Sequence, residues 1–178
     1  MKRRAAGRAL VLALLPPALL SGCAHPAAAL SAPSRSGRLL LRVGPADAPP
    51  LRSVAAGFEY QGNAHAGRLA LDGPLGARLA EARWGDTGVV LTDASGDRRY
   101  DSLSALAAEL LGEPLPLQAL GDWLLGQPWP EAPAEPTAVG FLQAGWQVDT
   151  HALADQGLLL ATRDTPAPAL LLRIVLDR

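Results

Sequence analysis

The chain of 178 residues contains a single cysteine, Cys23, and no run of basic residues beyond its first eight positions. In an exported chain a lone cysteine cannot form an internal disulfide, so it is free, intermolecular or modified. The fold must therefore be stabilised by packing alone. Because no basic patch or alternation of basic and aromatic residues is present, nucleic acid is excluded as a partner. No internal repeat or heptad pattern indicates an oligomer, and we expect a monomer.

The sequence also lacks a catalytic or metal-binding constellation. Asp93, Ser95 and Asp97 have the opening spacing of a calcium loop. The sixth position of that loop is Arg98 instead of glycine and the twelfth is Ser104 instead of glutamate, so the motif fails. The three histidines are not at metal-ligand spacing, and there is no phosphate-binding glycine loop. We therefore expect no enzyme activity, no metal and no cofactor, with a membrane-anchored enzyme as the remaining alternative.

Residues 1–22 have the pattern of a secretory signal peptide. Four basic residues within positions 2–8 precede an apolar stretch over 9–20 that is too short to span a bilayer as a helix. The stretch ends in Leu20-Ser21-Gly22-Cys23, which resembles the lipobox of bacterial lipoproteins. In that class the cysteine is lipidated and cleavage occurs just before it, and several acyl chains give stable anchoring. An ordinary signal peptide followed by a chance cysteine is the alternative.

Cleavage before Cys23 would remove the four positive charges and move the formal net charge from −1 to −5. Residues 23–36 would then be a lipidated, flexible tether, since they are rich in alanine, serine and proline and have no periodic pattern. Residues 37–178 are long enough for one domain with a sizeable core. In bacterial lipoproteins aspartate at the second mature position favours retention in the inner membrane, so by this resemblance Ala24 indicates the outer membrane.

The most informative stretch of the domain is a predicted hairpin over residues 67–84. The bend Gly73-Pro74-Leu75-Gly76 has the residue types of a type I turn, but it places a large apolar side chain, Leu75, at the tip. Such a residue is either an ordinary exposed leucine or a probe that enters lipid. The second arm, over 77–82, has helical propensity, but its length and the turns on both sides favour a strand.

The remaining pattern is strands, then two short helices, then strands. Strands are expected over 37–43, 51–61, 67–72, 77–82, 89–92, 142–148, 158–162 and 170–176, and a further short strand is expected to end at Tyr100. Helices are expected over 103–111, capped by Asp101 or Ser102 and ended by Gly112, and from Pro116 to Gly126, with a proline-rich loop over 127–136. This order predicts an α+β fold in which an antiparallel sheet curls under helices on one side. The concave side is then either an apolar cavity or a fully packed core.

Motifs spread over nearly the whole mature domain resemble the LolB family of outer-membrane lipoproteins. Besides the lipobox and the bend, they are Phe58-Glu59-Tyr60-Gln61-Gly62, Leu111-Gly112-Glu113-Pro114-Leu115-Pro116-Leu117, Gly145-Trp146 and Ile174-Val175-Leu176-Asp177-Arg178. The resemblance implies an incomplete, strongly curled antiparallel β-barrel with a short helical lid over an apolar cavity. It implies a lipid-anchored outer-membrane protein facing the periplasm, which accepts lipoproteins from a LolA-like periplasmic carrier, holds their acyl chains and inserts them into the outer-membrane lipid.

Individual residues can be assigned on this basis. Cys23 would be lipidated, and Leu75 matches the exposed apolar residue that assists membrane insertion in the family. The inward rows of the strands would line the cavity: Leu69, Leu71, Val89, Leu91, Trp146, Val148, Leu172 and Ile174. The helices would supply the lid: Leu106, Leu110, Leu120 and Leu124. Each of these residues could instead belong to a packed core. A register shift of one residue would also turn the inward side chains of a strand to the outer face of the sheet. The alternative function is a non-transferring lipid-binding or scaffold lipoprotein of the cell envelope.

Overall fold

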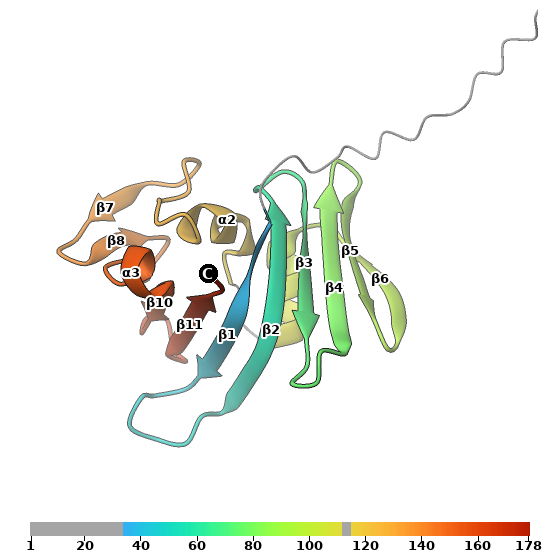
Figure 1. Cartoon of the computed structure of the whole chain (residues 1–178), viewed down its shortest axis with the longest axis horizontal. Helices are drawn as coiled ribbons and strands as arrows, with labels where there is room; N and C mark the ends of the chain where they lie inside the picture. Colours follow the sequence, from blue (N-terminus) through green and yellow to red (C-terminus); the bar gives the residue numbers. More distant parts are fainter. Residues whose placement is uncertain (1–33, 112–114) are drawn as a thin grey trace, which may run out of the picture.

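A computed structural model of the chain describes residues 34–111 and 115–178. These residues form one antiparallel sheet of 11 strands in the order β6-β5-β4-β3-β2-β1-β11-β10-β9-β8-β7, with three short α-helices (Figure 1). The predicted signal peptide, Cys23, most of the predicted tether and the predicted helix end at Gly112 lie outside the described residues. In the described ranges no helix has both the length and the apolar character needed to cross a bilayer.

The strands of the first half are β1 (Arg35–Val43), β2 (Arg52–Gly62), β3 (Gly67–Asp72), β4 (Arg78–Gly85), β5 (Gly88–Asp93) and β6 (Gly96–Tyr100). The helical segments are α1 (Leu103–Leu111), the 3-10 turn η1 (Leu117–Ala119), α2 (Leu120–Trp123) and α3 (Leu153–Gln156). The strands of the second half are β7 (Ala134–Pro136), β8 (Gly140–Gln143), β9 (Trp146–Asp149), β10 (Leu158–Arg163) and β11 (Leu170–Leu176).

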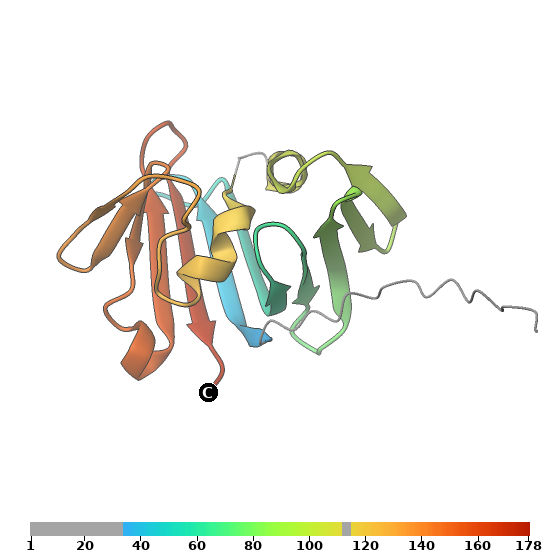
Figure 2. The same ribbon diagram turned by 90° about the horizontal axis from the view of Figure 1, so that it is seen from above.

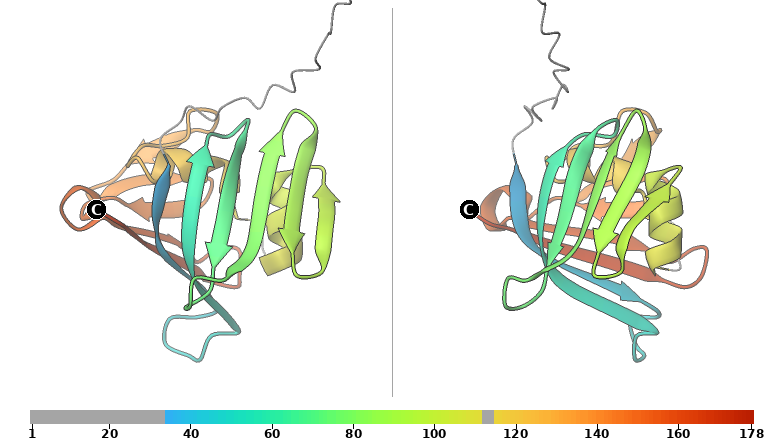
Figure 3. Two further views of the ribbon diagram at one scale, coloured as in Figure 1. Left: turned by 45° about the vertical axis from the view of Figure 1, so that its right-hand side comes forward. Right: turned by 90° about the vertical axis from the view of Figure 1, so that its right-hand side faces the viewer.

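The sheet is curled and open, as the sequence predicted. Strand twist rotates each strand against its neighbour, and over this many strands the sheet wraps around α2 (Figure 2). The edge strands β6 and β7 do not pair with each other, so the barrel is incomplete. Helix α1 stands beside β5 and β6 (Figure 3). The apolar core lies on the concave side, between the strands and these helices.

The hairpin around Leu75 forms as predicted, and its second arm is strand β4. Pairing with both β3 and β5 satisfies the backbone of β4, which outweighs its helical propensity. A β-bulge interrupts the pairing with β3: Leu71 is opposite Ala80 and Asp72 is opposite Arg78, so Leu79 is the extra residue. The bulge lies directly beside the bend.

Helix α1 also follows its predicted bounds. The Oγ of Ser102 accepts a hydrogen bond from the N–H of Ala105 at 3.1 Å, so Ser102 is the N-terminal cap. The segment after Pro116 is shorter than predicted, because a 3-10 turn leads into the single turn of α2. Gly126, at a φ of +76°, follows this segment in the left-handed conformation that glycine tolerates.

Four sequence predictions are corrected. Strand β1 begins at Arg35 rather than Gly37, because Arg35 pairs with Tyr60. The expected strand over 142–148 is two strands, β8 and β9, joined by a two-residue turn in which Ala144 and Gly145 both have positive φ. The proline-rich loop contains β7, which pairs with β8 at the sheet edge. The short helix α3 precedes β10 and was not predicted.

The connections between strands alternate between the two ends of the sheet, because neighbouring strands are antiparallel. Connections 44–51, 73–77 and 164–169 lie at one end, at the bottom of Figure 1, which we call the Leu75 end. The N–H of Gly44 donates to the carbonyl of Ala169 at 2.7 Å and joins two of these connections. Strand β1 begins at the opposite end, where its first residues pair with the end of β2.

Candidate functional site

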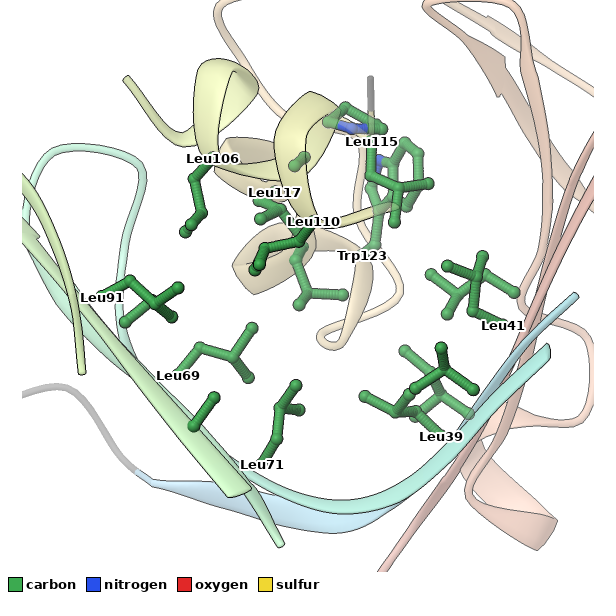
Figure 4. A pocket seen from close by; sticks show the side chains of 18 of the residues that line it. Leu39, Leu41, Leu69, Leu71, Leu91, Leu106, Leu110, Leu115, Leu117 and Trp123 are labelled. Atoms are coloured by element: carbon green, nitrogen blue, oxygen red, sulfur yellow. The ribbon is translucent and has the colours of Figure 1, made fainter. Parts of the chain in front are cut away.

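The concave side of the sheet contains an apolar pocket of about 110 Å³. In Figure 4 the labelled leucines of the strands and of the helices point into one common space. All lining residues are apolar: Leu39, Leu41, Val54, Leu69, Leu71, Ala80, Ala82, Leu91, Leu106, Ala107, Leu110, Leu115, Pro116, Leu117, Leu120, Trp123, Trp146, Leu172 and Ile174. Among the described residues its wall therefore has no titratable side chain, and its chemistry suits an apolar ligand.

Most of the residues predicted to line a cavity lie on this wall. From the strands these are Leu69, Leu71, Leu91, Trp146, Leu172 and Ile174, and from the helices Leu106, Leu110 and Leu120. The other three do not line the pocket. Val148 and Leu124 are buried in the surrounding core. Val89 lines a second, more polar pocket near the start of α1, together with Trp84 and Ser102.

The sequence interpretation missed the wall made by β1 and β2. Leu39 and Leu41 on β1 and Val54 on β2 face the pocket. Leu39 and Leu41 alternate along β1 with outward residues, so the period-2 pattern of that strand contained the signal. It also missed the small residues of β4. Ala82 lies between Leu69 and Leu91 in the cross-strand register, so the short side chain leaves space where a larger one would fill it.

The indole of Trp123, which lines the pocket, is held by Gln143. The Nε1–H of Trp123 donates to Oε1 of Gln143 at 2.9 Å, and the N–H of Trp129 donates to the same oxygen at 3.0 Å. The side-chain amide of Gln143 donates to the carbonyls of Trp129 and Ala132 at 2.8 and 2.9 Å. Gln143 is only 1% exposed, and all its hydrogen-bonding capacity is used. It therefore fixes α2 and the following loop to β8.

Sequence reasoning did not single out Gln143, because one glutamine in a short strand has no periodic signature. Its partners come from α2 and from the loop after it, 11 to 20 residues away in sequence. Aromatic contacts complete the arrangement. The ring of Trp123 lies 6.1 Å from that of Trp146 and 6.4 Å from that of Phe141, centroid to centroid. Contacts with Gln143, Trp146 and Phe141 thus fix the position of Trp123 in the pocket wall.

Tyr60 connects the strand wall to α2. Its ring packs on Trp84 at a centroid distance of 5.7 Å, and its hydroxyl points at Gly121, where an added Cβ would lie only 2.5 Å away. Glycine at position 121 thus allows α2 to approach the sheet. The hydroxyl is buried and finds no hydrogen-bond partner within residues 34–111 and 115–178. Burial, and secondly the negative charge of Asp122, raises the pKa of Tyr60 to about 12.

This raised pKa predicts a loss of stability in alkaline solution. The folded protein holds the Tyr60 proton more tightly than the unfolded chain, whose tyrosines titrate near pH 10. The stabilising effect is complete below about pH 10 and is lost as the pH rises toward 12, by about 2–3 kcal/mol. Urea unfolding across this range should show the fall. We expect Tyr60→Phe to remove most of this fall. The pKa of Tyr100 is also raised, by burial and by the hydrogen bond from its hydroxyl to Glu109, so Tyr100→Phe should remove a smaller part.

Leu75 lies outside the pocket, at the tip of the bend, and its side chain is 98% exposed. The N–H of Gly76 donates to the carbonyl of Gly73, and the N–H of Gly73 donates to the carbonyl of Ala77, each at 2.9 Å. Below the bend, Nε of Arg78 lies 2.6 Å from a carboxylate oxygen of Asp72. The hairpin therefore presents Leu75 to solvent on a well-ordered turn. In the described ranges no group of three His, Asp or Glu side chains could hold a metal ion.

The described residues thus form an open, curled antiparallel sheet around an apolar pocket, with an exposed leucine on a hairpin at one end, which is the architecture of a carrier of apolar groups rather than of an enzyme with a polar active site. A family model described as outer membrane lipoprotein LolB matches residues 35–178. The chain belongs to the LolB family.

Individual relatives support this assignment. The outer-membrane lipoprotein LolB of Bordetella petrii is 31% identical over 176 residues, which cover 90% of this chain and 88% of the relative. LolB of Bordetella pertussis is 32% identical over 157 residues, 82% of this chain and 77% of the relative. LolB of Chromobacterium violaceum is 32% identical over 142 residues, 73% of this chain and 75% of the relative.

Family membership confirms several predictions made from the sequence. The protein is an outer-membrane, lipid-anchored lipoprotein of a family that acts in lipoprotein localisation, with a receptor and insertion function. The alternative of a non-transferring scaffold lipoprotein is not favoured.

Proposed function

We propose that the apolar pocket receives the acyl chains of a client lipoprotein from a LolA-like periplasmic carrier and that Leu75 then assists their insertion into the outer membrane. The observation that carries this proposal is the wholly apolar lining of the pocket in a chain of the LolB family. Cys23, acylated and outside the described residues, would keep the protein at the membrane. The proposed role involves no catalysis, and one protein molecule acts on one client.

The pocket must enlarge to hold acyl chains. Its volume of about 110 Å³ is well below the roughly 300–1,000 Å³ of ordinary ligand pockets. The strand walls are joined by continuous backbone hydrogen bonds, whereas α1 and η1 meet the sheet through side chains, so displacing the helices costs less. We therefore assign the lid to the helical residues of the wall, among them Leu106, Leu110, Leu117 and Leu120.

Transfer between two apolar cavities avoids exposing the acyl chains to water. Each exposed CH₂ group would cost about 0.8 kcal/mol, so a chain that crossed water would face a large barrier. No phosphate-binding loop occurs in the sequence, and we infer that transfer runs downhill in affinity. The order would be carrier, this pocket, and finally the bilayer.

A transfer assay tests this function. The mature chain with Cys23→Ala is mixed with a carrier loaded with a lipoprotein, and the lipoprotein bound to each protein is measured after separation, first without vesicles. We expect the parent to accept the lipoprotein. Ala82→Leu places a larger side chain in the pocket and should lower acceptance at least tenfold, since the space for the acyl chain is filled.

Ala55→Leu is the matched control, because Ala55 is exposed on β2 and the same substitution there should leave acceptance unchanged. Thermal unfolding of both variants checks that the fold is retained. If the parent takes no lipoprotein from the carrier, the transfer function is wrong. If Ala82→Leu accepts lipoprotein as well as the parent, the acyl chains are held elsewhere.

A further inference from the structure

The three most exposed large apolar side chains of the described residues all belong to one end of the molecule. Leu75 is 98% exposed, Leu51 76% and Leu79 52%. Leu79 is the bulged residue beside the Leu75 bend. Leu51 belongs to a different connection, between β1 and β2, which also lies at the Leu75 end (Figure 1). Exposed leucines thus occur on two separate loops at the same end of the sheet.

The loop that carries Leu51 is braced at several points. The N–H of Leu51 donates to the carbonyl of Val43 at 2.8 Å, and Arg42 donates to the carbonyl of Ala48. The hydrogen bond from Gly44 to Ala169 ties the loop to the neighbouring connection. The exposed pair Pro49-Pro50 precedes Leu51, and the only charged residue of the 44–51 connection is Asp47. The exposure of Leu51 is therefore a property of an ordered, largely apolar loop.

We propose that Leu51, with Pro49 and Pro50, is a second membrane contact, so that the protein meets the bilayer on two loops rather than on Leu75 alone. This proposal rests on the membrane role of Leu75 in the proposed function. One inserted side chain leaves the domain free to pivot, whereas two on separate loops restrict its orientation.

A direct contact connects this loop to the pocket. The guanidinium of Arg52, the residue after Leu51, donates to the carbonyl of Leu110 at 3.0 Å. Leu110 lines the pocket and is itself 38% exposed. Insertion of Leu51 would therefore bring the Leu110 edge of the pocket close to the lipid. An acyl chain leaving at this edge would have the shortest path through water.

The length of chain before β1 agrees with a bilayer as the occupant of this surface. Strand β1 begins at the end opposite Leu75, and its nine residues span about 30 Å. Cys23 precedes Ser34 by 11 residues, which reach about 36 Å at full extension. An anchor in the membrane thus permits the Leu75 end to reach the same membrane. Arg42 and Arg52 place positive charge at the base of the loop, where anionic lipid phosphates would lie.

Single-cysteine labelling tests the proposal, because Cys23 is the only native cysteine. In the mature chain with Cys23→Ala, Leu51→Cys, Leu75→Cys and Leu142→Cys are each labelled with an environment-sensitive fluorophore. The protein is added to vesicles of phosphatidylethanolamine and phosphatidylglycerol that contain nitroxide-labelled lipid. We expect quenching at positions 51 and 75 and none at 142, which is exposed on the outer face of β8. Leu51→Glu should weaken vesicle binding about tenfold, and Leu142→Glu should leave it unchanged.

The outcomes separate this proposal from the proposed function. Quenching at 75 but not at 51 overturns the second contact and leaves the role of Leu75 intact. Quenching at neither position overturns both membrane contacts, while acceptance from the carrier is still measured without vesicles. Equal quenching at all three positions means nonspecific adsorption and also overturns the proposal. If Leu51→Glu binds vesicles normally but slows acceptance from the carrier, the loop contacts the carrier protein instead.

Discussion

Leu75→Glu is expected to leave acceptance of a lipoprotein from the carrier intact and to lower its delivery to vesicles about a hundredfold. The side chain is fully exposed and contacts neither the pocket nor the core, so the substitution changes neither folding nor the acyl site. Inserting leucine into lipid is favourable by about 1.5–3 kcal/mol, and a carboxylate reverses this gain. The measurement is the transfer assay with vesicles present, in which lipoprotein is located in the carrier, receptor and vesicle fractions.

Leu142→Glu provides the matched control for this effect, since it introduces the same charge at another exposed leucine on the outer face of β8. It should deliver normally. Normal delivery by Leu75→Glu would show that the leucine is an ordinary exposed residue. Loss of acceptance together with delivery would instead place the bend in the contact with the carrier.

Gln143→Leu is expected to destabilise the protein by about 4 kcal/mol. The substitution removes the acceptor for the N–H groups of Trp123 and Trp129 and the donor for the carbonyls of Trp129 and Ala132. Buried polar groups left without partners cost about 1–3 kcal/mol each, and part of this is relieved by rearrangement. For a domain of this size the melting temperature should fall by about 10 °C. Urea unfolding and calorimetry measure both quantities.

Gln147→Leu on the next strand is the control, because the Gln147 amide makes an exposed hydrogen bond to the hydroxyl of Thr137 at 3.0 Å. Its cost should stay below about 1 kcal/mol. Since Gln143 holds Trp123 in the pocket wall, Gln143→Leu should also lower acceptance at temperatures where the protein remains folded. A loss of stability no larger than in Gln147→Leu would mean that the Gln143 network contributes little.

Several parts of this structure could be predicted because their signals are local. The leucine alternation in β3 and β11 indicates strands, and the Gly-Pro-Leu-Gly bend contains the residues that its turn requires. The serine cap and leucine spacing of α1 are equally local. The turn at Ala144 and Gly145 was missed because alanine is not a turn residue and the flanking residues continue an apolar run.

The pocket could be predicted only in part. Alternation shows which residues share a face but not which face is concave, and the bulge at Leu79 changes the relation between β3 and β4. Val89 and Val148 have the same alternation as true lining residues, yet one faces the second pocket and the other the packed core. Whether an inward residue meets space or another side chain depends on the size of its neighbours, as at Ala82.

The sequence by itself determined the order of strands and helices from β1 to α2, the exposed leucine of the bend and the LolB family, because these depend on local pattern and on motifs in a given order. Only the tertiary structure decided where the pocket lies, that Gln143 holds Trp123 in its wall, and that Leu51 and Leu75 share one end of the sheet. These features depend on contacts between segments distant in sequence, through strand register, sheet curl and the alternation of hairpins. No single segment contains that information.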